Sequence, residues 1–343
     1  MTRSTIRTPL WLGLVAATLS AAVTCGLAPA LASAVPTLDT LMTDLGYKDA
    51  DVQRVRRGEL VTTTTKETNA REIATVMAFL VKAPVKTLVG AFEIGAAFRN
   101  DPQVKAVTEI RGDGTVGDFK AVVLPPKEAQ HYLNAAPGDA LNLSSEEIAA
   151  FQALKGSGTG QAQAEEALRR MLLARYQAYR ARGLAGIAPY ARSGGKSSSA
   201  ADDLRRATEA AHVLKAREPA FYAALLNYPA DVPAGLTERF FCVRYEMGGR
   251  PNFTLRHRLV LPVGDAYVAA DREYYVSREY NDVQAIAALL PVEDGTIVLY
   301  RTRTTTDQLG GFGASAKQAI GRRMMTRQIS EIFEKTRAGF AKQ

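Results

Sequence analysis

Apolar and polar residues alternate with a period of two along the last third of the chain, and this alternation predicts β-strands. Within Arg239–Met247, the residues Phe241, Val243, Tyr245 and Met247 share one side, as in a strand with one buried face. The glycine-rich turn 248–252 separates this segment from Phe253–Leu261, in which every second residue is apolar apart from His257. The two segments therefore predict an antiparallel hairpin.

Further strands are predicted at Ala266–Ser277, Asp282–Val292 and Thr296–Thr306, with an acidic turn ending in Gly295 between the last two. Such short connections favour antiparallel neighbours. After Gly313 the period changes to three or four residues, which predicts an amphipathic terminal helix of about 25 residues. The residues of its predicted apolar stripe are Ala316, Ile320, Met324, Gln328, Ile332, Phe333 and Phe340.

The N-terminal part of the chain supplies more candidate elements. The β-branched run Leu60–Lys66 predicts a first strand. Arg71–Val81 is an apolar segment that ends before Pro84, the residues 84–99 have a helical pattern, and Val104–Ile110 with Phe119–Leu124 predict a hairpin across a glycine-containing turn. If these strands belong to the same sheet as the C-terminal ones, the sheet is discontinuous in sequence.

The residues between the two halves of this sheet, 125–238, predict a mostly helical insertion. A capping signature at Leu141–Ile148 marks a helix start. Glu165–Arg182, Ala201–Lys215 and Pro219–Leu226 predict further helices, and the Gly/Ser-rich residues 193–199 predict a mobile loop. This loop contains Gly-Gly-Lys-Ser but lacks the glycine spacing of a phosphate-binding loop.

These elements predict an α+β fold, in which a curved antiparallel sheet grips a long C-terminal helix. The run Tyr300-Arg301-Thr302-Arg303 leads into Asp307-Gln308-Leu309-Gly310-Gly311 and the terminal helix. This order resembles the end of a helix-grip domain of the START and polyketide-cyclase-like (SRPBCC) superfamily, over roughly the last third of the chain. The resemblance implies a cavity between the sheet and the C-terminal helix that holds a lipid-like or other apolar ligand.

The first 34 residues have the pattern of a secretory signal peptide. Arg3 and Arg7 precede the apolar segment Leu10–Leu27, and Ala32-Ser33-Ala34 is a small-residue cleavage site. We therefore expect residues 1–34 to be cleaved and the protein to be exported, either to a periplasm or to the medium. The mature chain would then comprise a lead-in with the first part of the sheet (35–124), the insertion (125–238) and the C-terminal strands and helix (239–343).

The formal net charge is +8, and it falls to +6 without Arg3 and Arg7. In an exported protein this excess favours an anionic membrane surface as a partner, or simple solubility. No basic run interleaved with aromatic residues indicates a nucleic-acid partner. Cys242 is the one cysteine beyond the predicted signal peptide, and the three histidines lie far apart in sequence. The pattern therefore predicts no metal and no cofactor.

Two polar residues of the C-terminal strands are candidates for binding a ligand head group. His257 lies on the apolar face of its strand, where it would either point into the cavity or form a core histidine bonded to a carboxylate or hydroxyl, and the second interpretation is favoured. Arg301 alternates in phase with Ile297 and Leu299, so it could face inward and bind an anionic head group. The expected site is completed by Tyr245, Phe241, Phe253, Leu255 and Met324.

Two other functions compete with ligand carriage. The first is a cavity enzyme of the cyclase or hydratase type, which would use Glu246, His257, Asp271, Glu273 and Tyr275 if they converged. The second is an envelope scaffold that binds another protein, expected if large side chains plug the concave side of the sheet. An enzyme needs two ionisable groups within hydrogen-bond reach of each other and of the ligand, whereas a carrier needs apolar walls with one polar anchor.

Overall fold

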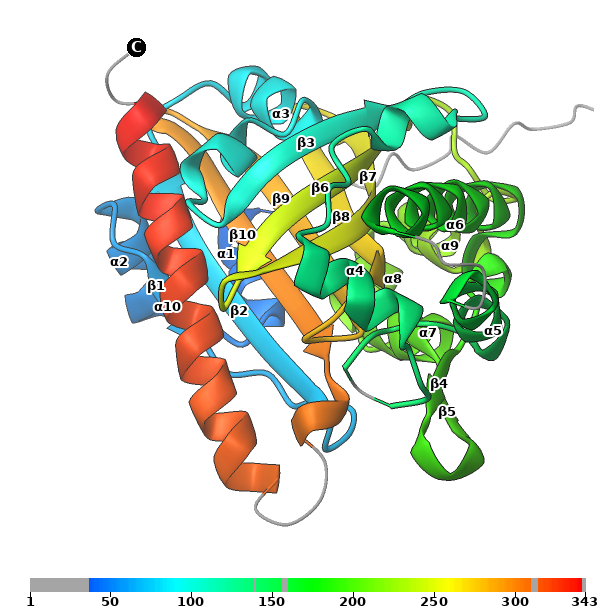
Figure 1. Ribbon diagram of the computed structural model, residues 1–343. Helices are drawn as coiled ribbons and strands as arrows, with labels where there is room; N and C mark the ends of the chain where they lie inside the picture. Colours follow the sequence, from blue (N-terminus) through cyan, green and yellow to red (C-terminus); the bar gives the residue numbers. More distant parts are fainter. Residues whose placement is uncertain (1–36, 139, 156–159, 310–313, 341–343) are drawn as a thin grey trace, which may run out of the picture. The chain divides into compact units, whose positions relative to one another are not determined.

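An eight-stranded antiparallel sheet runs through the computed structural model, and both ends of the chain contribute to it (Figure 1). The structure describes residues 37–138, 140–155, 160–309 and 314–340, so the predicted signal peptide lies outside the described residues. The strand order is β1-β2-β10-β9-β8-β7-β6-β3. The bounds are β1 Val61–Thr63, β2 Glu72–Val81, β3 Val104–Ile110, β6 Thr237–Met247, β7 Arg250–Val263, β8 Ala266–Val276, β9 Asp282–Val292 and β10 Gly295–Thr305.

The predicted α+β fold is confirmed, and the C-terminal strands lie where the alternation places them. Strand β7 begins earlier than expected because Gly248 and Gly249 alone form the turn, and Met247 pairs directly with Arg250. Both glycines have a positive φ, +57° and +72°. Two-residue hairpin turns of this kind require such angles, which glycine adopts without steric cost.

Strand β2 is the main element that the periodicity does not reveal. All ten of its residues are buried, and it pairs with β1 on one side and with β10 on the other. A strand covered on both faces has no polar side, so its sequence is a continuous apolar run without alternation.

The predicted hairpin between Val104–Ile110 and Phe119–Leu124 is wrong. Strand β3 pairs with β6 instead, and the chain turns into a 3₁₀ helix, Val116–Phe119, whose start is capped by the Asp118 carboxylate accepting from the Thr115 amide. Phe119, Val122 and Leu124 are buried in the core formed with the insertion helices. Their apolar character therefore reflects helix packing and not strand pairing.

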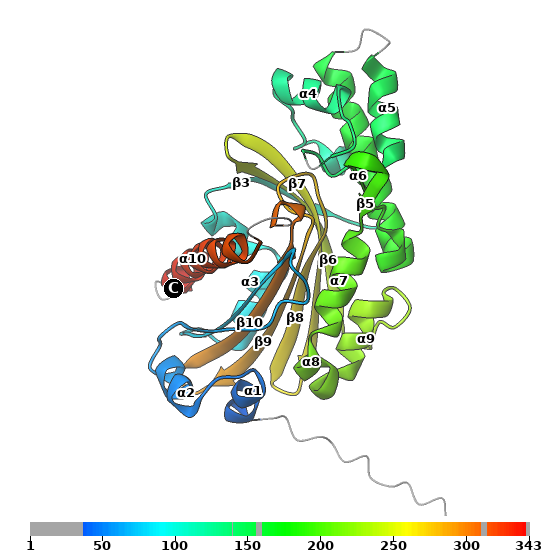
Figure 2. The same cartoon turned by 90° about the horizontal axis from the view of Figure 1, so that it is seen from below.

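The sheet has two faces, which we call inner and outer. The inner face carries Tyr300 and is covered by α3 (Val85–Glu93), the 3₁₀ helix η1 (Ala96–Asn100) and α10 (Ala314–Phe340). The outer face carries Leu299 and is covered by α1 (Leu38–Asp44), α2 (Asp49–Arg56) and the insertion. Figure 2 shows α10 and α3 on one side of the sheet and α6 to α9 on the other.

The insertion is mostly helical, as predicted. Its helices are α4 Pro126–Leu133, α5 Ser145–Lys155, α6 Gln161–Arg182, α7 Ala200–Glu209, α8 His212–Arg217 and α9 Pro219–Asn227. The capping signature is confirmed, because Ser144 and Glu147 each accept a hydrogen bond from the other's backbone amide. The expected mobile loop is instead the hairpin β4 (Tyr190–Arg192) and β5 (Lys196–Ser198), and the buried Ser198 hydroxyl donates to Asp307.

The C-terminal helix exists as predicted, and its predicted apolar stripe packs on the sheet at Phe333 and Phe340 but not at Ile320 and Met324. Phe333 contacts Phe79 and Tyr300, with ring centroids 4.5 and 5.0 Å apart. Ile320 and Met324, which belong to the predicted stripe, are 61% and 68% exposed. Polar contacts set the rotation of the helix: hydrogen bonds join Thr326 to Thr75, Gln318 to the Glu72 carbonyl and Arg337 to the Gly58 carbonyl.

Candidate functional site

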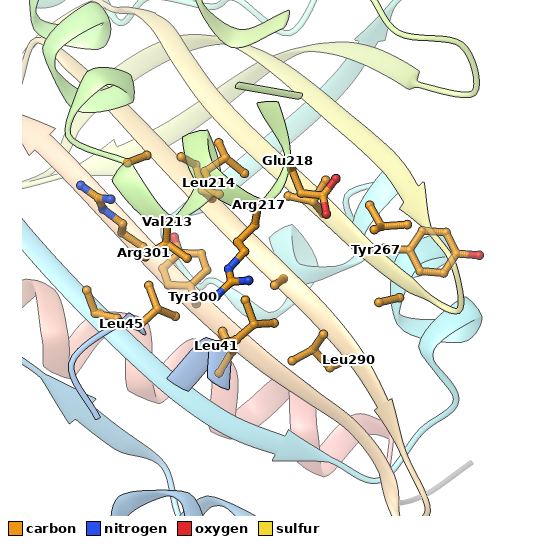
Figure 3. A pocket seen from close by; sticks show the side chains of 18 residues that line it. Leu41, Leu45, Val213, Leu214, Arg217, Glu218, Tyr267, Leu290, Tyr300 and Arg301 are labelled. Atoms are coloured by element: carbon orange, nitrogen blue, oxygen red, sulfur yellow. The ribbon is translucent and has the colours of Figure 1, made fainter. Parts of the chain in front are cut away.

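An apolar pocket lies between the outer face of the sheet and the helices α1 and α8 (Figure 3). Its walls combine Leu41 and Leu45, at the start of the described chain, with Val213 and Leu214 of α8 and with residues of β2, β7, β8, β9 and β10. The sheet residues include Val76, Val268, Ile286, Ala288, Leu290 and Leu299. The pocket thus lies on the face opposite to α10, and not between the sheet and the C-terminal helix where the cavity was expected.

Strand register explains why residues distant in sequence meet in this pocket. Arg301 of β10 pairs with Val76 of β2 on one side and with Ile286 of β9 on the other. Leu299 pairs with Ala288, and directly opposite residues of neighbouring strands point to the same face. All of these side chains therefore project towards α1 and α8.

The pocket has a volume of about 100 Å³. An apolar cavity of about 150 Å³ holds a benzene molecule, so this smaller pocket accommodates a short alkyl group and not a ring. Its wall contains three charged residues, Arg217, Glu218 and Arg301. Apolar walls with few polar groups are typical of small-molecule binding sites.

Arg301 is the charged residue of the pocket wall that lacks a partner. Its Nη2 atom is buried and has no hydrogen-bond partner among the described residues. Burial, and then the nearby charge of Arg303, lower the pKa of Arg301 to about 10. The guanidinium is therefore still cationic at neutral pH, although its surroundings disfavour the charge.

The other two charged residues, Arg217 and Glu218, lie at the end of α8. Arg217 donates to Asp44 across a 2.7 Å contact, which joins α8 to α1. Burial raises the pKa of Glu218 above its ordinary value. No ion pair joins Arg217, Glu218 and Arg301 to one another in the described part of the chain, so the pocket wall does not contain an acid–base pair.

His257 does not line this pocket. It is fully buried on the outer face under α6, where Nε2 lies 3.0 Å from Glu238 Oε2 and Nδ1 lies 3.1 Å from the Tyr179 hydroxyl. Arg272 Nη1 donates to the Tyr179 oxygen over 3.2 Å. Because an arginine can only donate, the Tyr179 oxygen accepts from Arg272 and its hydroxyl proton is donated to His257 Nδ1. The single proton of the neutral imidazole then lies on Nε2, which donates it to the Glu238 carboxylate.

Burial lowers the pKa of His257, and the Glu238 carboxylate only partly offsets this effect. The ring is stacked on Phe240 with centroids 4.2 Å apart. Both ring nitrogens thus have protein partners, which is the arrangement of a core histidine bonded to a carboxylate and a hydroxyl.

The remaining expected site residues are not brought together. Phe241 and Tyr245 lie on the inner face against Phe98, whereas Phe253 and Leu255 lie in the outer-face core with the insertion helices. Cross-strand pairing causes this separation, because Phe241 is opposite Arg256 while Leu255 is opposite Cys242. Met324 is exposed on α10. Of the seven residues, Arg301 alone lines the pocket.

Two of the acidic residues considered for catalysis do meet, on the inner face. Arg256 lies 3.0 Å from Asp271 and 2.9 Å from Glu273, and Arg258 lies 2.9 Å from Asp271. Burial would raise the pKa of Asp271, but the two arginines outweigh it and hold that pKa below its ordinary value. Burial raises the pKa of Glu273, to which Tyr280 donates over 2.6 Å.

This ion-pair network is not joined to the other catalytic candidates. His257 and Tyr275 lie on the opposite face, in the core that the insertion covers, and Glu246 is exposed at the end of β6. Each carboxylate of the network is already bonded to an arginine. The arrangement ties β7 to β8, and it does not form the convergent acid–base site that the enzyme hypothesis requires.

Neither the comparisons nor the composition of the described residues supplies a further functional assignment. No helix within those residues has the length and apolar content to cross a membrane, and no cluster of His, Cys, Asp or Glu among them is arranged to hold a metal ion. No family model, no curated protein and no solved structure matches the chain. The resemblance to the START and polyketide-cyclase-like superfamily therefore stays a prediction.

Proposed function

We propose that this protein binds a lipid-like or other small apolar molecule in the pocket between the outer sheet face and helices α1 and α8, without catalysing a reaction on it. The observation that carries the proposal is the chemistry of the pocket wall, in which aliphatic side chains from α1, α8 and five strands surround a space of about 100 Å³. Removing an apolar ligand from water into such a space is favourable, at about 25 cal/mol for each Å² of apolar surface buried.

The absence of an acid–base pair in the pocket wall supports binding over catalysis. Among the described pocket residues, Arg217 is neutralised by Asp44, and Arg301 has no carboxylate partner. A cavity enzyme needs a general acid or base next to the substrate with a pKa tuned by a second group. The acidic candidates Asp271 and Glu273, which pair with Arg256, lie on the inner face and not in the pocket wall.

The experiment is to fill the pocket. Val213 lines it from α8, whereas Ala216 on the same helix is exposed and does not. In Val213→Trp the indole would occupy the space, so we expect loss of binding of a neutral apolar probe, octanol, measured by calorimetry or by displacement of an environment-sensitive dye. Ala216→Trp carries the same substitution and should bind octanol like the unmodified protein.

Native mass spectrometry of the protein purified from its own cells, followed by organic extraction, tests the same proposal without a chosen probe. A stoichiometric co-purifying apolar molecule that is absent from Val213→Trp supports it. Equal binding by the unmodified protein and both variants would place the ligand elsewhere. A clean apo mass, together with no response to any apolar molecule in a thermal-shift panel, would refute the proposal.

A further inference from the structure

One end of the pocket carries a charged residue, Arg301, and the other end, at Leu290, is apolar. Arg301 lies at the level of Ile286, while Leu290 pairs with Ile297 four residues further along β10. At roughly 3.3 Å for each residue of a strand, the two levels are ~13 Å apart. Apolar side chains, among them Leu299 and Ala288, fill the interval. Figure 3 shows Arg301 and Leu290 on opposite sides of the pocket.

The arginines next to Arg301 on the outer face have partners that the protein itself supplies. Arg303 lies 2.5 Å from Glu72, and Arg272 donates to Gln284, to the Leu225 carbonyl and to Tyr179. One buried nitrogen of Arg303, Nε, also lacks an acceptor, but Arg303 has the Glu72 carboxylate as a partner, whereas Arg301 has a buried Nη2 without an acceptor and no ion pair among the described residues. A buried donor of a charged group that lacks an acceptor is costly, and such a group gains from any ligand that provides one.

The electrostatic surroundings also favour an anion at Arg301. The charge of Arg303, two residues further along the same face, disfavours the Arg301 cation, and only Glu72 opposes this effect. A ligand anion at Arg301 would therefore offset the cost of holding this cation next to the charge of Arg303. At the rim of the pocket, Arg217 is already paired with Asp44, and Glu218 would repel a second negative group.

We propose that the ligand is an amphiphile with a single anionic head group, a carboxylate, which binds the guanidinium of Arg301 while a short alkyl chain lies along β9 and β10 towards Leu290. This inference rests on the proposed function, since it needs the pocket to be a binding site. The volume of about 100 Å³ limits the tail to a short chain. A carboxylate suits arginine because two parallel N–H···O bonds can form.

Three probes with the same tail test the inference: octanoate, octanol and octylamine. We expect octanoate to bind more tightly than octanol, and octylamine to bind least. In Arg301→Gln, octanoate should lose roughly ten- to a hundredfold in affinity, the range for a hydrogen bond to a charged group. Octanol should bind that variant as well as it binds the unmodified protein.

The matched control is Arg323→Gln, which removes the same charge from an exposed position on α10 and should leave octanoate affinity unchanged. Arg301→Gln removes an unpaired buried cation, so its melting temperature should equal or exceed that of the unmodified protein, which separates loss of binding from loss of folding. Arg301→Lys should recover part of the octanoate affinity, because lysine keeps the charge but not the bidentate geometry.

Failure of this inference differs from failure of the proposed function. If octanol binds as tightly as octanoate, and Arg301→Gln changes neither, the pocket binds apolar molecules without an anion anchor and the inference is wrong. Tightest binding of octylamine would also overturn it and would assign the anchor to Glu218. If none of the three probes binds, and Val213→Trp behaves like the unmodified protein, the proposed function itself fails.

Discussion

Arg217 of α8 and Asp44 of α1 form an ion pair that joins the two helices lining the pocket, with 2.7 Å between Nη2 and Oδ2. Both side chains are more than a third exposed, so the pair contributes little to overall stability, about 0.2–1 kcal/mol. Its position matters more than its strength, because α1 and α8 must separate if a ligand is to enter or leave between them.

We expect Asp44→Asn to speed ligand exchange without unfolding the protein. The dissociation rate of a bound apolar probe, measured by stopped-flow displacement, should rise roughly two- to fivefold, the factor that corresponds to losing an exposed ion pair. Asp39→Asn is the control, since Asp39 also lies on α1 but pairs with Arg56 of α2. Equal rates for the two variants would show that the Asp44–Arg217 pair does not hold the pocket closed.

Tyr179 connects Arg272 to His257 within the outer-face core, and Tyr274 stacks on it with ring centroids 3.9 Å apart. The Tyr274 hydroxyl is buried without a hydrogen-bond partner in the described structure. We therefore expect Tyr179→Phe to cost about 1–3 kcal/mol, since it leaves two buried polar atoms short of a partner. Tyr274→Phe, which removes an unpaired hydroxyl, should be neutral or stabilising.

Urea unfolding measures the free energy of unfolding of Tyr179→Phe and of Tyr274→Phe, and the two values can be compared directly. Both lose one hydroxyl from stacked, fully buried rings, so the loss of apolar packing is the same and the difference isolates the hydrogen bonds. A destabilisation of Tyr274→Phe as large as that of Tyr179→Phe would contradict the assignment of the hydrogen-bond chain through Tyr179.

The neutral state of buried His257 makes stability depend on pH. Burial lowers its pKa in the folded protein, whereas the unfolded chain has a pKa of about 6.5. The unfolded state therefore binds more protons in this range, so the His257 contribution is fully present above that pH and is lost as the pH falls towards the folded pKa. Glu238, whose pKa is below its ordinary value despite burial because His257 donates to it, stays ionised throughout.

The measurement compares unfolding free energies at about pH 7.5 and about pH 5.5. In the unmodified protein the value should be smaller at the lower pH. His257→Gln, which has no titrating ring, should show a smaller decrease, while His212→Gln, at an exposed position of α8, should show the full one. Identical pH dependence in all three proteins would mean that the pKa of His257 is the same in the folded and the unfolded state.

The C-terminal helix offers a test of which of its faces contacts the sheet. Phe333 packs on Phe79 and Tyr300, so Phe333→Ala should lower the free energy of unfolding by on the order of 3 kcal/mol. Met324→Ala should change it by less than about 0.5 kcal/mol, as expected for an exposed side chain. Equal effects in thermal or urea unfolding would indicate that Met324 also contacts the sheet.

The strands were predictable where polar residues occupy every second position, as in β7, whose Arg256 and Arg258 form ion pairs with Asp271 on the inner face. Strand β2 was not predicted as a strand. All ten of its residues are buried, so the alternation on which the prediction depends is missing. The helix stripe at Ile320 and Met324 was misassigned because polar partners such as Thr75 and the Glu72 carbonyl set the rotation of α10. Such long-range partners are not visible in helical periodicity.

The site was predictable in part. Parity along β10 correctly grouped Arg301 with Leu299, since side chains two apart share a face. This parity does not show which helices cover that face. Helices α1 and α8 are far from β10 in sequence, and a local pattern of apolar residues carries no information on such distant contacts. Tyr245 and His257 were placed in one cavity because each strand was interpreted alone, and only the register shows that they lie on opposite faces.

The sheet order has a consequence for how the protein is made. Both edge strands, β1 and β3, come from the first third of the chain, and Val81 of β2 pairs with Thr296 while Ile110 of β3 pairs with Phe240. During synthesis the N-terminal strands leave the ribosome long before their partners exist, so apolar β2 has an open edge until β10 is complete. A chain that ends before residue 295 would leave this edge of β2 unpaired, and an unpaired apolar strand edge is a template for aggregation.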